Sequence, residues 1–189
     1  MNIKPGEIEH DHAGVVKEDP TAVKELPIWT DEAGVELAVV GKRVNTIKSQ
    51  VRKSGDPFYE YKIMQLVNEI GLPAPKPIAK AEQSGSHLIV MEKALGFTYF
   101  DGGPLLMHYG YLPGEIETLK RQAGEQMAEL KDRFDEAGII RKWKLSDIIF
   151  DVDIEAKKIR KITPVDWERT KIDETKLRAY KKRLKASSG

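Results

Sequence analysis

Two aspartates near the C-terminal end of the chain stand beside short apolar runs and could bind a metal ion. Asp147 comes directly before the run at 148–150, and Asp166 follows the run at 162–165. The polar residues 153–161 between the runs are typical of a turn, so the segment predicts a β-hairpin. A hairpin brings strand ends together, and two carboxylates there could hold a divalent cation through oxygen ligands. The sequence therefore predicts a metal site on an acidic hairpin spanning 147–166.

A second group of candidate residues lies around the clearest helix start. The Asp-Pro pair at 56–57 is typical of an N-cap followed by the first helical position. Apolar residues at helical spacing follow, and Gly71 is typical of a residue that ends a helix. These signals predict a helix at 57–70, which carries Glu60. The β-rich run before the helix contains Lys42.

The remaining elements alternate between extended and helical patterns. Prolines follow the first helix and force an extended bend, because each proline disfavours helical geometry in the residue before it. Farther on, apolar residues at every third or fourth position predict a long amphipathic helix. The expected elements are two strands at 78–82 and 87–92, a linker with one short helix at 93–114, the long helix at 115–137 and a basic last helix at about 173–186.

Composition limits the classes of function. The chain has 189 residues and no cysteine, which excludes disulfides, thiol chemistry and cysteine-ligated zinc. Its 31 Lys and Arg residues nearly cancel its 30 Asp and Glu residues, so no global field favours nucleic acid or a membrane. No apolar run approaches the roughly 18 residues of a membrane span. We expect a soluble, cytoplasmic protein.

Taken in order, these elements and motifs resemble the protein-kinase-like superfamily. The pattern of motifs is most similar to that of the small atypical members of this superfamily, the RIO-type kinases and the aminoglycoside- and choline-type phosphotransferases. The resemblance covers roughly residues 35–170. The motifs that carry it are Glu60 followed by Gly71-Leu72-Pro73-Ala74-Pro75, the run Leu88-Ile89-Val90-Met91-Glu92 with Gly96, Ala137-Gly138-Ile139-Ile140, Asp147-Ile148-Ile149-Phe150-Asp151, and Val165-Asp166-Trp167-Glu168.

The resemblance implies an α+β fold in two lobes. The N-lobe, 1–95, would hold a small antiparallel sheet and the helix at 57–70. The C-lobe, 96–189, would be truncated and mostly helical, with the long helix, the acidic hairpin and the basic terminal helix. Such a short C-lobe resembles the smallest atypical kinases, including minimal bacterial effector kinases that are delivered into a host cell.

The resemblance also implies roles for residues of the N-lobe. Lys42 would contact the α- and β-phosphates of ATP and be held by an ion pair to Glu60. Lys24 is a rival for this role, because its surroundings also look like the family's lysine motif. The phosphate-binding glycine loop matches poorly, with only Gly14 and Val16 at the expected positions.

Further implied roles concern adenine and the metal. The backbone of Met91, Glu92 and Lys93 would be the hinge that hydrogen-bonds adenine. Asp166 matches the family's metal-binding aspartate, with Trp-Glu in place of the usual Phe-Gly. Asp147 stands where the family has a metal-binding asparagine, and its carboxylate could also bind Mg²⁺. The implied cofactors are ATP and Mg²⁺.

The segment after 138–140 departs from the family pattern. Where the family has a histidine or tyrosine, then arginine or glycine, then the catalytic aspartate, this chain has Arg141, Lys142 and Trp143. Three interpretations stay open. Asp147 itself acts as the catalytic base, or Arg141 or Lys142 stabilises the transferring phosphoryl group. In the third, the chain binds nucleotide without transferring phosphate, as a pseudokinase does.

The sequence thus favours a monomeric kinase-like phosphotransferase that acts on a Ser or Thr hydroxyl of a protein and has a non-standard catalytic loop. The alternatives are a pseudokinase-type module that binds a protein partner, and a phosphotransferase for a small molecule. Binding of nucleic acid through the basic last helix is less favoured, because a charge run at a helical terminus is usually a solvated face. Neither a histidine metal site nor a Gly-x-Ser-x-Gly hydrolase motif is indicated.

Overall fold

The structure is a computed structural model that describes residues 23–25, 29–30, 36–44, 55–83 and 86–187. Gly14 and Val16 of the predicted phosphate loop lie outside these residues. The chain divides into two compact units, which we describe one at a time: the first is 1–65 with 75–93, and the second is 66–74 with 94–189. The sequence predicts a boundary at 95/96 instead, with the whole first helix in the first part.

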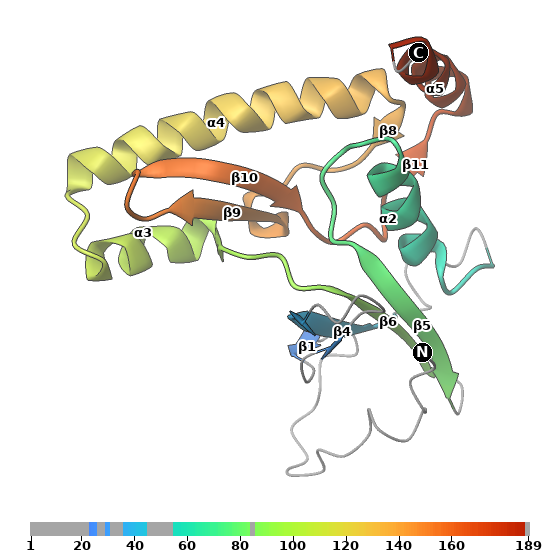
Figure 1. Ribbon diagram of the computed structural model, residues 1–189, viewed down its shortest axis with the longest axis horizontal. Helices are drawn as coiled ribbons and strands as arrows, with labels where there is room; N and C mark the ends of the chain where they lie inside the picture. The colour runs from blue at the N-terminus through green and yellow to red at the C-terminus, as the bar shows by residue number, and fades with distance from the viewer. Residues whose placement is uncertain (1–22, 26–28, 31–35, 45–54, 84–85, 188–189) are drawn as a thin grey trace. The chain divides into compact units, whose positions relative to one another are not determined.

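The first unit contains a four-stranded antiparallel sheet (Figure 1). Lys42 lies in an interior strand, opposite Val23 of one neighbouring strand and Ile89 of the other. The neighbouring strand that carries Ile89 is buried at its centre, as we expect for a continuous run of apolar residues. In spatial order the strands are β1 (Val23–Glu25), β4 (Val39–Arg43), β6 (Ser86–Glu92) and β5 (Pro77–Gln83), and a separate short pair is formed by β2 (Trp29–Thr30) and β3 (Glu36–Leu37).

Helix α2 (Tyr59–Glu69) begins two residues later than the sequence predicts. Asp56 caps it as expected, since its carboxylate accepts a hydrogen bond of 2.9 Å from the Phe58 N–H. At the other end, Gly71 has φ +73° and follows the last turn, where the Leu72 N–H donates to the Val67 carbonyl. The cap and the terminating glycine therefore set the position of Glu60 in the first turn.

The second unit is built around a hairpin flanked by two helices. Figure 1 shows the hairpin of β9 and β10 between α3 and α4, both of which contact it. A 3₁₀ turn leads into β9, and a two-stranded pairing lies near α5. The elements are β7 (Phe97–Thr98), α3 (Tyr99–His108), α4 (Pro113–Glu136), β8 (Ile139–Ile140), η2 (Leu145–Asp147), β9 (Ile148–Asp153), β10 (Lys158–Pro164), β11 (Lys171–Ile172) and α5 (Glu174–Ser187).

The core of the second unit lies between α4 and the hairpin. Successive turns of α4 bury the stripe that the sequence predicts, and β9 alternates buried and half-buried residues because its side chains point to opposite faces. Trp167 and Phe134 are fully buried. The buried apolar residues of this core are Ile116, Leu119, Ala123, Leu130, Phe134, Ile139, Ile148, Phe150, Val152, Ile159, Ile162 and Trp167.

Two details of the hairpin differ from expectation. The predicted turn at 153–161 is too long, because β10 already begins at Lys158. The charged residues that suggested a turn lie on the exposed face of this strand, while Ile159 and Ile162 are buried. A shift in register between Ile159 and Lys161 breaks the simple alternation that would have revealed the strand.

The described chain is therefore a mixed fold of helices and small antiparallel sheets, which confirms the α+β class. The long predicted helix is confirmed as α4, and the basic last helix as α5. In the described residues, no helix combines the length and apolar character needed to cross a bilayer.

Candidate functional site

Lys42 and Glu60 form a buried ion pair within the first unit. The Lys42 Nζ lies 2.8 Å from the Glu60 Oε1, and the two side chains are only 10% and 4% exposed. Strand β4 supplies the lysine from the middle of the sheet, and the first turn of α2 supplies the glutamate. A carboxylate in the first turn is also stabilised by the helix dipole. The two residues that the sequence singled out for one function are thus brought together.

Lys24, the rival lysine, lies on β1, next to the strand of Lys42. Its position in the register is opposite Gly41. The two candidates therefore occupy neighbouring strands of one sheet. The ion pair to Glu60 that the structure describes is made by Lys42, whereas the side chain of Lys24 lies outside the described residues.

The segment predicted to bind adenine continues from the end of β6. The Glu92 N–H donates to the Lys76 carbonyl at 2.8 Å, and the Lys93 N–H donates to the Ala38 carbonyl at 2.8 Å. Met91 is paired within the sheet to Val40. Two of the three N–H groups of the predicted hinge are therefore engaged within the first unit.

The second group of predicted residues lies in the second unit, where Asp147 ends the 3₁₀ turn η2. Its carboxylate accepts a hydrogen bond of 2.8 Å from the Ser146 hydroxyl, and the Lys144 Nζ lies 3.8 Å away. The Asp147 carbonyl accepts a hydrogen bond of 2.8 Å from the Val165 N–H. This backbone contact brings the segment before the hairpin next to Asp166, as we predict for the two ends of a β-hairpin.

Asp166 has a left-handed backbone, with φ +62°. This region is unfavourable for residues other than glycine, although aspartate tolerates it better than most. Non-glycine residues held there often lie at functional sites, where the surrounding structure enforces the strain. The neighbouring Trp167 is fully buried and fixes the chain on that side.

Asp147 and Asp166 line one shallow, open pocket, which lies wholly within the second unit. Its walls come from the segment before η2 and from the turn after β10. Besides the two carboxylates, cationic side chains surround it. The lining residues are Arg141, Lys142, Lys144, Asp147, Asp166, Arg169 and Thr170.

Arg141 is held in an aromatic clamp that the sequence did not predict. Its guanidinium lies 4.4 Å from the ring centre of Trp167 and 5.3 Å from that of Trp143. Its Nη2 also donates a hydrogen bond of 2.7 Å to the Val165 carbonyl. The ring of Phe134 stacks on Trp167, with centroids 5.8 Å apart. Arg141 therefore positions the backbone beside Asp166.

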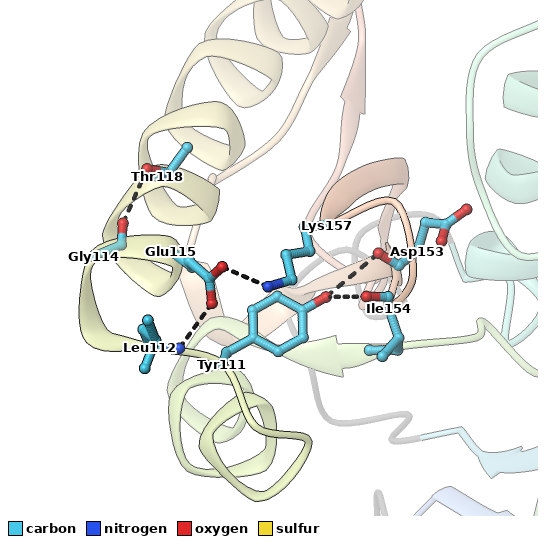
Figure 2. A network of polar contacts seen from close by, with 8 residues as sticks. All are labelled: Tyr111, Leu112, Gly114, Glu115, Thr118, Asp153, Ile154 and Lys157. Carbon is cyan, nitrogen blue, oxygen red and sulfur yellow. Dashed lines mark hydrogen bonds and ion pairs between the residues drawn. The ribbon is translucent and has the colours of Figure 1, made fainter.

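A polar network anchors the turn of the hairpin to the start of α4 (Figure 2). The Tyr111 hydroxyl donates to the Ile154 carbonyl at 2.9 Å, and Lys157 forms an ion pair with Glu115. The hydrogen bond from Lys157 lowers the pKa of the Glu115 carboxyl, and burial raises the pKa of Tyr111. The network lies at the far end of β9 and β10 from Asp147 and Asp166, and it stabilises the hairpin that carries them.

The donor set fits a magnesium ion better than a metal held by protein ligands alone. Among the described residues, no group of three or more His, Cys, Asp or Glu side chains could hold a metal. Mg²⁺ commonly takes one or two carboxylates and completes its shell with water and phosphate oxygens. Asp147 and Asp166 both line the pocket and are two carboxylates of the kind that such a site uses.

No protein-family model matches the sequence, and no curated protein matches it. Inference about function therefore starts from the side chains that this fold brings together.

Proposed function

We propose that the chain is a minimal, kinase-like phosphotransferase that binds ATP with Mg²⁺ and transfers the γ-phosphoryl group to a Ser or Thr hydroxyl of a protein. The observation that carries the proposal is the buried pair of Lys42 and Glu60. Its residues are 18 positions apart in sequence, one on a strand and one on the following helix. A two-lobed kinase-like fold requires that arrangement in its N-lobe.

The order of the elements supports the same proposal. The strand with lysine and the helix with glutamate are followed by the antiparallel strands β5 and β6, then by the long helix α4 and the hairpin with Asp147 and Asp166. The first unit thus holds a candidate phosphate-binding cation, and the second unit holds two candidate metal-binding carboxylates.

In the proposed mechanism, Lys42 binds the α- and β-phosphates and Glu60 holds the lysine in position. Asp166 and Asp147 would hold Mg²⁺, which supplies charge neutralisation on the phosphates. The acceptor oxygen forms a new bond to the γ-phosphorus while the bond from that phosphorus to the β-phosphate oxygen breaks. The products are ADP, a phosphate ester and the hydroxyl proton.

The proposed reaction also needs a group that accepts the proton of the acceptor hydroxyl. Residues 139–146 contain no Asp or Glu, so Asp147 is the first carboxylate of the segment. In the proposal Asp147 accepts the hydroxyl proton, directly or through water. A carboxylate that also binds a metal is a poor base, and we therefore expect slow turnover.

One observation favours a second candidate, a pseudokinase-type module that binds nucleotide without transferring phosphate. Arg141 and Trp143 stand where the family has its catalytic segment, and their side chains form the aromatic clamp with Trp167. This segment therefore has a structural role in the present chain. A phosphotransferase for small molecules is supported only by the sequence Asp166-Trp167-Glu168.

Transfer of labelled γ-phosphate separates these candidates. The purified chain is incubated with γ-labelled ATP, Mg²⁺ and a mixture of Ser- and Thr-containing proteins, beside Asp166→Asn and the exposed control Asp132→Asn. Label in protein that is lost in Asp166→Asn but kept in the control supports the kinase. Nucleotide binding without transfer supports the pseudokinase, and absence of both contradicts the nucleotide site.

A further inference from the structure

The pocket that contains Asp147 and Asp166 carries more positive than negative side chains. Four cationic residues and two aspartates line it. The cations come from two separate segments, one before η2 and one in the turn after Trp167. The pocket therefore has a net positive charge before any metal binds, which is unusual for a site built around carboxylates.

Three of these cations form what we call the basic rim, namely Lys142, Lys144 and Arg169. Lys142 is exposed, and the side chains of Lys144 and Arg169 are each 52% exposed. Two of them form long ion pairs, since the Lys144 Nζ lies 3.8 Å from the Asp147 carboxylate and the Arg169 Nε lies 3.9 Å from the Glu168 carboxylate. Both distances exceed a hydrogen bond, so these ion pairs are weak.

Arg141, the fourth cation, is not part of the rim. It is buried in the aromatic clamp and donates to the Val165 carbonyl. Lys171 extends the rim along the surface instead. It is exposed on β11 opposite Ile140, two residues before Lys142. The positive charge thus continues beyond the pocket along two adjacent segments.

We propose that the basic rim binds the acidic side chains of a protein segment that carries the acceptor hydroxyl. The role of that hydroxyl rests on the proposed kinase function, whereas binding of the segment does not. Arg169 can form paired hydrogen bonds with a carboxylate, and the two lysines act as point charges. Exposed cations also attract an acidic segment before contact and repel a basic one.

An extended acidic segment fits the rim better than nucleic acid does. The rim holds three cations beside two aspartates, which would repel a continuous phosphate backbone. Isolated carboxylates with a flexible spacing can instead place themselves on separate cations.

The test is the binding of two fluorescein-labelled peptides, measured by fluorescence anisotropy. One has a serine flanked by glutamates, and the other has glutamines in their place. The rim variant is Lys142→Glu with Arg169→Glu. The matched control is Lys182→Glu with Lys185→Glu, which makes the same change of charge at exposed positions of α5. All four residues are exposed, and urea unfolding of both variants checks that the fold is kept.

We expect the wild type to bind the glutamate peptide about tenfold more tightly than the glutamine peptide at low salt. The rim variant should lose this difference, and the α5 control should keep it. Equal binding of the two peptides, or an equal loss in both variants, overturns the proposal. A labelled oligonucleotide that binds more tightly than the peptide and is released only by the α5 control assigns the basic surface to nucleic acid instead.

Phosphate transfer to the same peptides separates this inference from the proposed function. Selective binding of the glutamate peptide without phosphate transfer supports the binding of acidic segments by the basic rim and contradicts the proposed kinase function. Equal transfer to both peptides supports the kinase and overturns the rim.

Discussion

At the scale of single residues, the buried ion pair of Lys42 and Glu60 adds little net stability to the fold. Removing two charges from water costs several kcal/mol, and their attraction offsets this only when geometry is good. Both side chains are almost excluded from solvent. Apolar residues could fill the same space, so the presence of the pair favours a functional reason for it.

Replacing the pair in two steps separates its structural role from its functional role. Lys42→Met alone should destabilise the fold by about 3–5 kcal/mol, because it removes the ion-pair partner Lys42 from the buried Glu60 carboxylate. The double variant Lys42→Met with Glu60→Leu should recover most of that stability. Urea unfolding measures both, with and without ATP and Mg²⁺. The double variant should gain no stability from the nucleotide, and a gain equal to that of the wild type would remove Lys42 from the site.

The strained backbone of Asp166 gives a second prediction. Glycine accepts a φ of +62° without steric cost, so Asp166→Gly should be as stable as the wild type or more stable by about 1 kcal/mol. The same variant should lose any Mg²⁺-dependent stabilisation by ATP. Thermal unfolding with Mg²⁺ or with EDTA tests both parts. A variant that is clearly less stable would show that the Asp166 side chain is kept for structure.

At the scale of elements, the strand β7 approaches the hairpin so closely that it depends on one glycine. Gly96 has φ +117°, and a Cβ there would overlap the carbonyl of Phe150 on β9. Gly96→Ala should therefore destabilise the fold by roughly 2–4 kcal/mol. Gly110→Ala is the matched control, since Gly110 also has positive φ but a Cβ would meet no atom within 4 Å. Chemical denaturation that gives equal losses for both would contradict this packing of β7.

The network at the hairpin turn predicts a pH dependence. The hydrogen bond from Lys157 lowers the pKa of Glu115 below its ordinary value of 4.5. A lowered pKa in the folded state means that the stabilisation is present above about pH 4.5 and is lost as the pH falls through the folded-state pKa. NMR titration of Glu115 should show a pKa below 4.5 that returns towards it in Lys157→Met. An unchanged pKa in that variant would contradict the ion pair, which strong salt should also weaken.

Some elements of this fold can be predicted from the sequence pattern, and others cannot. Helices α2 and α4 can be predicted within two residues, because caps, a terminating glycine and a regular apolar stripe act locally. The pairing of β8 with β11 cannot be predicted in this way, because each strand has only two residues and the two strands are far apart in the sequence. The sequence predicts too short a β10 because the register shift of this strand hides the alternation.

The same distinction applies to the candidate site. The sequence predicts that Lys42 meets Glu60, and that Asp147 and Asp166 lie at one end of a hairpin, because strand and helix order constrain these positions. The clamp of Arg141 by Trp143 and Trp167 depends on how buried rings approach in three dimensions. Its signal in the sequence is a pair of tryptophans near an arginine, and that combination does not specify how the three side chains pack.

At the scale of the whole molecule, near-neutral total charge conceals an uneven distribution. The chain has a net charge of +1, yet the pocket at Asp147 and Asp166 is rimmed by cations. Local charge therefore says more about a binding partner than the total does. We propose a phosphate-binding role for Lys42 in the first unit, and we propose metal binding and anion binding for the pocket of the second unit.

The most direct test of this account is a calorimetric titration of the purified chain with a non-hydrolysable ATP analogue, in Mg²⁺ and in EDTA. The account predicts one binding site that requires Mg²⁺, is lost in Asp166→Asn and is retained in Asp132→Asn. Absence of binding, or binding that is indifferent to Mg²⁺ and to Asp166, would contradict the central claim that these residues form a nucleotide site.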